Sequence, residues 1–199
     1  MKRFAALLTL SVAILLFAPV GHAARFTGNL SGPAESPPNT STATGFAAVE
    51  LDTERHTMRV SVSFSGLSTP TVMAHIHCCV APNGTAGVAT AVPAFAGFPL
   101  GVTGGSFDAV FDTTQASTWN APFIAANGGT PAGAEARLAS GLAAGQAYQN
   151  VHTTAIPGGE IRGFLVPQVD IPVFSGWTLG MVAAVLALLG FAALRKRAA

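Results

Sequence analysis

Thr57-Met58-Arg59-Val60-Ser61-Val62-Ser63-Phe64 is a strict alternation of polar and apolar side chains. Because successive side chains of a strand point to opposite faces, the apolar half of this stretch faces a core and the polar half faces solvent. A second strand candidate, residues 45–51, precedes it across a polar turn at residues 52–56. The pattern predicts a half-buried antiparallel hairpin.

Similar short segments continue on both sides of the hairpin, separated by turns rich in glycine and proline. The further strand candidates are residues 25–30, 74–80, 88–92, 106–112, 148–153 and 160–166. One short helix is expected after Thr130 and Pro131, which suit its N-cap and first position, with its end at Gly145. The sequence therefore predicts an all-β domain, an antiparallel β-sandwich with one short helix.

The first residues have the composition of a secretory signal peptide. Lys2 and Arg3 precede an apolar run at residues 4–20, and the small residues around Ala23 and Ala24 suit a cut after either of them. We expect residues 1–24 to be the signal peptide, so that the chain is exported. The alternative is a first transmembrane anchor.

The other end carries an uncharged run at residues 177–194, and Arg195-Lys196-Arg197 follows at once. As a helix rising about 1.5 Å per residue, this run is about 27 Å long, enough to cross the hydrocarbon core of a bilayer. A basic cluster after the span marks the cytoplasmic side. The pattern predicts a C-terminal transmembrane helix in the inner membrane, with the domain on the periplasmic or outer-surface side.

The same tail resembles a known class of sorting signal. Ile171-Pro172-Val173-Phe174-Ser175-Gly176-Trp177, followed by the apolar run and the basic cluster, is similar to PEP-CTERM signals, above all their IPTL variant. Val173-Phe174 replaces Thr-Leu, and Gly176 replaces an acidic residue. The resemblance implies that residues 169–199 direct surface delivery in a Gram-negative bacterium, with cleavage by an exosortase-type membrane enzyme. A plain single-span anchor is the alternative and predicts the same topology.

Between the two ends the chain is acidic. Residues 24–170 carry five arginines and nine acidic side chains, 5 − 9 = −4, and both lysines lie outside this range. Such a domain has no electrostatic basis for binding nucleic acid.

Ala74-His75-Ile76-His77-Cys78-Cys79-Val80 gathers two of the five histidines and both cysteines into one strand candidate. In an extended strand, His75, His77 and Cys79 point to the same face. With His152 from a neighbouring strand they form a candidate ligand set for Cu or Zn. The preferred alternative is that the histidines are structural and hydrogen-bonded across the sheet.

Two further arrangements are expected near this cluster. Cys78 and Cys79 are adjacent, so a vicinal disulfide between them would staple no distant segments; free thiols or metal ligands are the alternative. Glu160 and Arg162, two residues apart, are expected to join His152 in a buried polar network. A single carboxylate in this group gives no basis for a general-acid pair.

Several separated motifs together resemble the CHRD domain, named for its occurrence in chordin. They are Leu30-Ser31-Gly32, Phe64-Ser65-Gly66-Leu67, Ala74-His75-Ile76-His77, Asn150-Val151-His152-Thr153 and Pro157-Gly158-Gly159-Glu160-Ile161-Arg162-Gly163. The resemblance implies an immunoglobulin-like sandwich over residues 25–168 and no agreed activity. Cys78-Cys79 departs from the family pattern, in which a glycine-containing turn commonly follows the His-x-His.

These patterns together predict an exported, membrane-anchored or surface-sorted module with a binding or structural role and no catalysis. An extracellular-matrix or surface partner would suit such a module. The first alternative is a copper- or zinc-binding protein that uses the His-x-His strand. The second is a redox-responsive module that uses the Cys78-Cys79 pair.

Overall fold

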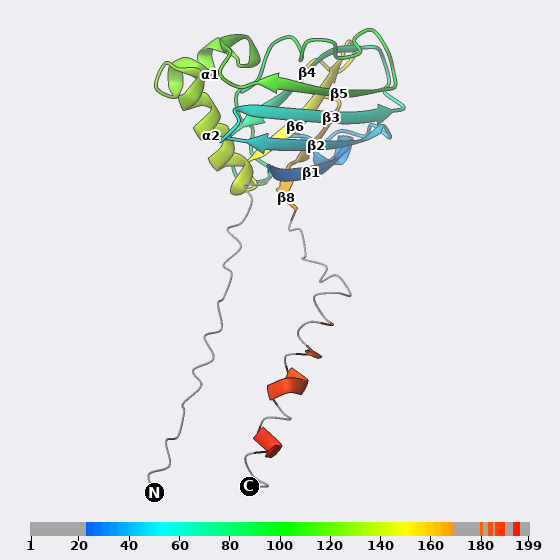
Figure 1. Ribbon diagram of the computed structural model, residues 1–199. Coiled ribbons are helices and arrows are strands. Elements are labelled where there is room, and N and C mark those ends of the chain that lie inside the picture. The colour runs from blue at the N-terminus through cyan, green and yellow to red at the C-terminus, as the bar shows by residue number, and fades with distance from the viewer. Residues whose placement is uncertain (1–22, 169–179, 181–182, 185, 190–192, 196–199) are drawn as a thin grey trace, which may run out of the picture. The chain divides into compact units, whose positions relative to one another are not determined.

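The computed structural model describes residues 23–168, 180, 183–184, 186–189 and 193–195 (Figure 1). The chain divides into two compact units, Met1–Pro167 and Gln168–Ala199. Residues 1–22 of the predicted signal peptide, the sorting motif and part of the predicted transmembrane helix lie outside the described residues. Among the residues that are described, no helix combines the length and the apolar character needed to cross a membrane.

The described part of the first unit contains eight strands. They are β1 (Ala24–Ser31), β2 (Thr44–Asp52), β3 (Thr57–Ser65), β4 (Thr71–Cys78), β5 (Gly105–Asp112), β6 (Ala147–Thr153), β7 (Ile161–Phe164) and β8 (Val166–Pro167). Their order in space is β4-β6-β7-β1-β2-β3-β5, with β8 paired to β1, and all neighbours are antiparallel. The prediction of an antiparallel all-β domain is confirmed.

The predicted hairpin is the pair of β2 and β3, which is in continuous register from Thr44↔Ser65 to Asp52↔Thr57. Every second side chain of β3 is buried, as the alternation requires. In the turn, the Asp52 carboxylate accepts hydrogen bonds from the backbone N–H groups of Glu54 and Arg55. These bonds satisfy donors that the strand ladder leaves open, so they define where β2 ends.

The strand path curls so that β1, β2, β3 and β5 form one layer and β4 and β6 pass behind it (Figure 1). Val62 of one layer, and Ile76 and Val151 of the other, belong to the same buried core. The layers remain connected through Ser31 of β1, which pairs with Arg162 of β7. The fold is therefore sandwich-like, and the immunoglobulin-like arrangement of two separate sheets stays a prediction.

The predicted helix is α2 (Pro131–Ala143), at one end of the layers (Figure 1). The Thr130 hydroxyl accepts the N–H of Gly133 at 3.1 Å, and Pro131 occupies the first turn, as expected. A second helix, α1 (Ala121–Ala126), was not predicted because six residues are too few to show a helical period. The predicted strand at residues 88–92 is present only as isolated bridges to His77 and Trp119.

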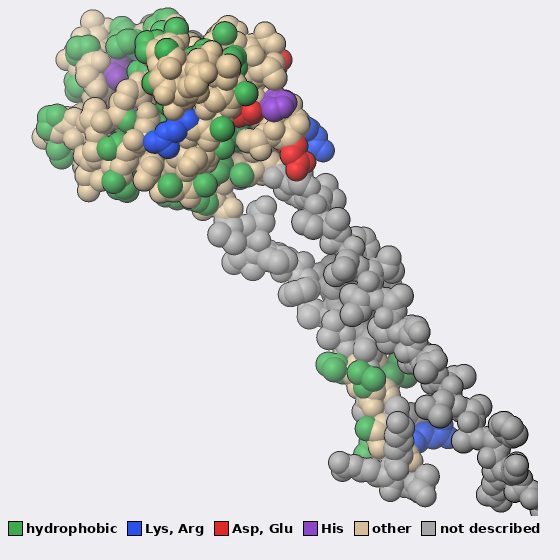
Figure 2. Space-filling model, turned by 90° about the vertical axis from the view of Figure 1, so that its left-hand side faces the viewer, with side chains coloured by type: hydrophobic (Ala, Val, Ile, Leu, Met, Phe, Trp, Pro, Cys, Tyr) green, Lys and Arg blue, Asp and Glu red, His purple; other side chains and the backbone are tan. Residues whose placement is uncertain are grey.

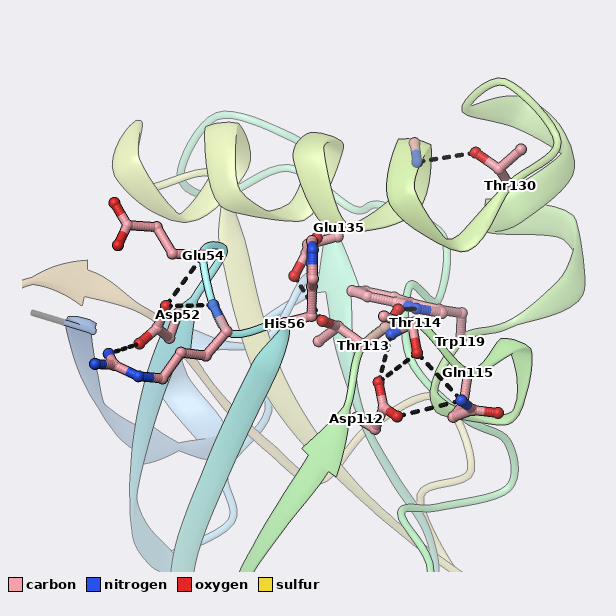
Figure 3. Close-up of polar contacts among 12 residues, drawn as sticks. Asp52, Glu54, His56, Asp112, Thr113, Thr114, Gln115, Trp119, Thr130 and Glu135 are labelled. Carbon is pink, nitrogen blue, oxygen red and sulfur yellow. Dashed lines mark hydrogen bonds and ion pairs between the residues drawn. The ribbon is translucent and has the colours of Figure 1, made fainter. Parts of the chain in front are cut away.

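Polar contacts connect α2 to the end of the sheet (Figure 3). Glu135 of α2 has one carboxylate oxygen 2.8 Å from Nδ1 of His56, in the turn after β2. Its other oxygen accepts the hydroxyl of Thr113, just after β5, at 2.6 Å. The indole N–H of Trp119 donates to the Thr113 carbonyl. One helix side chain thus joins two separate turns of the sheet.

The structure joins Cys78, the last residue of β4, to Cys79 by a disulfide. Both sulfur atoms lie against Gly141 of α2, where a β-carbon would collide with each of them. Cys79 also lines an open hollow of about 380 Å³, together with Phe123 and Arg137. The helix therefore approaches the disulfide closely because residue 141 has no side chain.

We expect Gly141→Ala to destabilise the oxidised protein. The higher helix propensity of alanine alone would stabilise the protein by about 1 kcal/mol, but overpacking against the two sulfur atoms destabilises it by about 1–3 kcal/mol. Urea unfolding of Gly141→Ala beside the exposed control Ser140→Ala measures the difference.

In a Cys78→Ala/Cys79→Ala background the same Gly141→Ala change should be neutral or stabilising, because the sulfur atoms are gone. A double-mutant cycle over these positions isolates the contact. Stabilisation by Gly141→Ala in the oxidised protein would contradict the packing.

Candidate metal centre

β4 and β6 bring three histidines to one face of the curled sheet. In β4 the side chains of Ala74, Ile76 and Cys78 enter the core, so His75 and His77 point to the opposite face. The pairing of His75 with Asn150 and of His77 with Tyr148 puts His152 on the same face, one pair further along. The register of a single strand pair therefore determines the cluster.

The three imidazoles lie close together and are almost fully removed from solvent. The exposed fractions of His75, His77 and His152 are 2%, 8% and 4%. One ring nitrogen of each lies within 4.8 Å of those of the other two. The ring centroid of His75 is 4.8 Å from that of His77 and 4.6 Å from that of His152.

Two backbone carbonyls determine which nitrogen of these rings has a free lone pair. Nδ1 of His77 lies 2.8 Å from the Ala86 carbonyl, and Nδ1 of His152 lies 2.9 Å from the Pro157 carbonyl. A carbonyl oxygen only accepts, so both Nδ1 atoms carry the hydrogen and both Nε2 atoms keep the lone pair. The same kind of bond orients metal-ligating histidines.

One buried nitrogen in each of the three rings has no hydrogen-bond partner among the described residues. Nε2 of His77, Nε2 of His152 and Nδ1 of His75 are buried without a hydrogen bond. Structural histidines bonded to one another across the sheet would satisfy these atoms. Buried polar groups without partners are rare and costly, which makes this group the strongest candidate site of the described residues.

Burial keeps the imidazoles neutral. It lowers the pKa of His75 to about 3, with smaller effects from His152 and His77 in the same direction. Burial also lowers the pKa of His77 to about 4 and brings the pKa of His152 below its usual range. A neutral imidazole is the form that binds a metal ion.

Tyr148 and Arg162 form the wall of the cluster. The Tyr148 ring stacks on His77 with centroids 4.7 Å apart, and its hydroxyl accepts the N–H of Ala86 at 3.2 Å. The Arg162 guanidinium lies 4.8 Å above the Tyr148 ring and donates to the carbonyl oxygens of Ala34 and Gly84. The same residues therefore tie the covering loops to the sheet.

A second buried polar group adjoins the histidines through Asn150, which pairs with His75 on one side and Arg162 on the other. Arg162 lies 3.8 Å from Glu35, and burial raises the pKa of Glu35 to about 7 although Arg162 opposes the shift. Sequence reasoning missed Glu35 and Tyr148. The alternation of Tyr148, Asn150 and His152 along one strand was the available signal for Tyr148.

The predicted polar network required Glu160 to contact His152 and Arg162. Among the described residues, no hydrogen bond or ion pair joins Glu160 to either of them. The carboxylate of Glu160 instead accepts hydrogen bonds from Ser41, Ser68 and Thr153 at 2.6–2.8 Å. β7 begins at Ile161, so Glu160 precedes the strand and the expected alternation does not apply to it. Burial acts to raise the pKa of Glu160, but these hydrogen bonds outweigh it and leave the pKa lowered.

Cys79 does not share the face of His75 and His77. β4 ends at Cys78, so the alternation that would place Cys79 beside the histidines stops one residue earlier. Its sulfur is bonded to Cys78 and lies 3.7 Å from the Arg137 carbonyl of α2. Of the four predicted metal ligands, the structure brings together the three histidines.

This chain is similar in sequence to a known family of protein domains. A family model described as the CHRD domain matches residues 26–165. The chain belongs to the CHRD domain family. The matched CHRD segment includes all three histidines of the cluster, both cysteines and the loops that carry Ala86 and Pro157. No curated protein and no solved structure matches the chain.

We expect the metal-free CHRD domain to lose stability as the pH falls from 7.5 to 5. A histidine of the unfolded chain titrates near 6.5, whereas His75 and His77 titrate at about 3 and about 4 in the folded domain. Protonation therefore favours unfolding in this window, by about 2 kcal/mol at pH 5 for each of these two. Protonation of His152 also favours unfolding. Glu35 has the opposite effect, because its pKa is raised in the folded domain: its protonation stabilises the fold by about as much as one histidine destabilises it.

Urea unfolding at the two pH values measures this loss. His75→Gln removes one titrating group and should reduce the pH dependence by about 2 kcal/mol. An unchanged pH dependence in His75→Gln would show that His75 is not held neutral by burial.

Proposed function

We propose that this CHRD domain binds one transition-metal ion through His75, His77 and His152. Two observations carry the proposal. Each of the three histidines has a buried ring nitrogen without a hydrogen-bond partner, and each ring has a nitrogen within 4.8 Å of a nitrogen of the other two. Each unpaired buried acceptor costs about 1–3 kcal/mol. A bound metal ion would remove this cost, because each nitrogen would form a coordinate bond to it.

The ligand set favours copper or zinc over the hard cations. Imidazole suits Cu and Zn, whereas Mg²⁺ and Ca²⁺ take oxygen ligands, and no carboxylate belongs to the histidine group. In a tetrahedral site, nitrogens about 2.0–2.1 Å from one ion lie about 3.3–3.4 Å apart, so nitrogens that are 4.8 Å apart must approach by about 1.4 Å when the ion binds.

We expect the purified full-length chain to bind one Cu or Zn ion. His77→Ala and His152→Ala should each weaken binding by at least tenfold, because each removes one of the three ligands. His56→Ala is the matched control, since His56 lies in the turn after β2 and contacts Glu135. Elemental analysis of the chain as isolated and calorimetric titration with each metal give stoichiometry and affinity.

Circular dichroism of each variant establishes that it is folded, and His77→Gln repeats the test with a larger side chain. Equal metal affinity in wild type, His77→Gln and His152→Ala would overturn the proposal. The histidines would then have the structural role that the sequence also allows.

We propose further that the domain works outside the cytoplasm, anchored to the membrane or sorted to the surface. The signal-peptide composition of residues 1–24, the sorting-type motif at residues 171–177 and the Cys78–Cys79 disulfide support this location. A binding role without catalysis, near a surface or matrix partner, suits a module delivered in this way.

Of the two cuts that the sequence allows, after Ala23 or after Ala24, we expect the first, so that the exported form begins at Ala24. Ala24 is the first residue of β1 and pairs with Leu51, so a cut after Ala23 leaves the strand complete. Intact-mass analysis of the cell-surface fraction measures this end and shows whether an exosortase-type enzyme has shortened the tail. A chain that retains residues 1–23 would contradict signal-peptide cleavage.

A further inference from the structure

We infer that the metal of this site is copper, bound in the cuprous state, and that the thioether of Met73 is its fourth ligand. The inference rests on the proposed metal-binding function. It adds a ligand and a metal identity that the histidine cluster alone leaves open.

The strand register places Met73 beside the cluster. Met73 precedes His75 by two residues in β4 and pairs directly with His152 of β6. Directly paired residues of antiparallel strands have their β-carbons about 4.5–5.5 Å apart, within reach of a long side chain. The backbone of Met73 therefore lies directly beside that of His152.

The burial pattern of β4 gives the direction of the Met73 side chain. Ala74, Ile76 and Cys78 belong to the apolar core, whereas Met73 is half-buried and is not one of the residues that pack against that core. An apolar side chain that alternates with core residues lies on the opposite face, which is the histidine face.

A β-bulge lies directly before Met73. The register shifts between Thr71, which pairs with Thr153, and Met73, which pairs with His152, so Val72 is the extra residue. Val72 is 36% exposed. Bulges re-aim side chains and are frequent next to functional sites. Here the bulge allows Thr71 to be buried while Met73 keeps the phase of His75 and His77.

Ligand chemistry selects copper. Thioether sulfur and imidazole together suit Cu(I), whereas zinc sites use thiolate, imidazole or carboxylate. Three neutral imidazoles and a thioether carry no negative charge. Because the cost of burying an ion rises steeply with its charge, a buried site without an anionic ligand accepts a monovalent ion at lower cost than a divalent one.

The test is anaerobic titration of the full-length chain with Cu(I) against a chromogenic Cu(I) chelator, with Zn(II) titrated separately. We expect Met73→Leu to lower Cu(I) affinity at least tenfold and to change Zn(II) affinity by less than twofold. Leucine nearly conserves the volume, so the fold is retained. Met58→Leu, in the buried face of β3, is the matched control and should change neither affinity.

X-ray absorption spectroscopy at the copper edge identifies the atoms bound to the copper ion directly. Wild type should show a sulfur neighbour together with imidazole nitrogens, and Met73→Leu should show nitrogens alone. If copper binds through the histidines with no sulfur neighbour and with equal affinity in Met73→Leu, this inference fails while the proposed function stands. If neither metal binds the wild-type chain, the proposed function itself fails.

Discussion

The antiparallel register between β4 and β6 is the constraint on which the rest of the site depends. It aligns His75 with Asn150 and His77 with Tyr148, so one strand pair gathers titratable and aromatic side chains on a single face. A shift of β4 by one residue would turn His75 and His77 into the apolar core. The outer edge of β4 is protected by the segment that carries Val88 and Ala94, which leaves this strand no free edge for another pairing.

The polar face of this layer is buried by loops instead of by a second sheet. The loops supply carbonyl oxygens to His77, His152 and Arg162, and these bonds determine ring orientation while they close the site. The Arg162 guanidinium also lies 3.8 Å from the Glu35 carboxylate and above the Tyr148 ring, so one charge contacts both the covering loop and the histidine cluster's aromatic neighbour. Charged side chains are few among the described residues on the face drawn in Figure 2.

Short-range patterns in the sequence were sufficient for most of the strands and for α2, but not for α1 or for residues 88–92. The alternation from Thr57 to Phe64 gave the hairpin, and the Thr130-Pro131 pair gave the start of α2, because both signals arise from local geometry. The common face of His75 and His77 followed from the same period. Strand pairing does not follow from period alone, so the approach of His152 was a hypothesis and the carbonyl partners had no sequence signal. Cys79 and Glu160 were misplaced because each lies one residue beyond the end of a strand, where alternation ceases.

The contact between Gly141 and the two sulfur atoms limits which substitutions this chain tolerates. Position 141 and the cysteine pair, more than sixty residues apart, depend on each other, because a β-carbon at 141 would collide with both sulfur atoms. Substitutions at these positions are therefore coupled: a side chain at 141 costs stability while the disulfide is present and costs less once the cysteines are replaced. The cysteine pair next to the His-x-His strand thus favours a glycine in a neighbouring helix, although the stability of that helix alone would not.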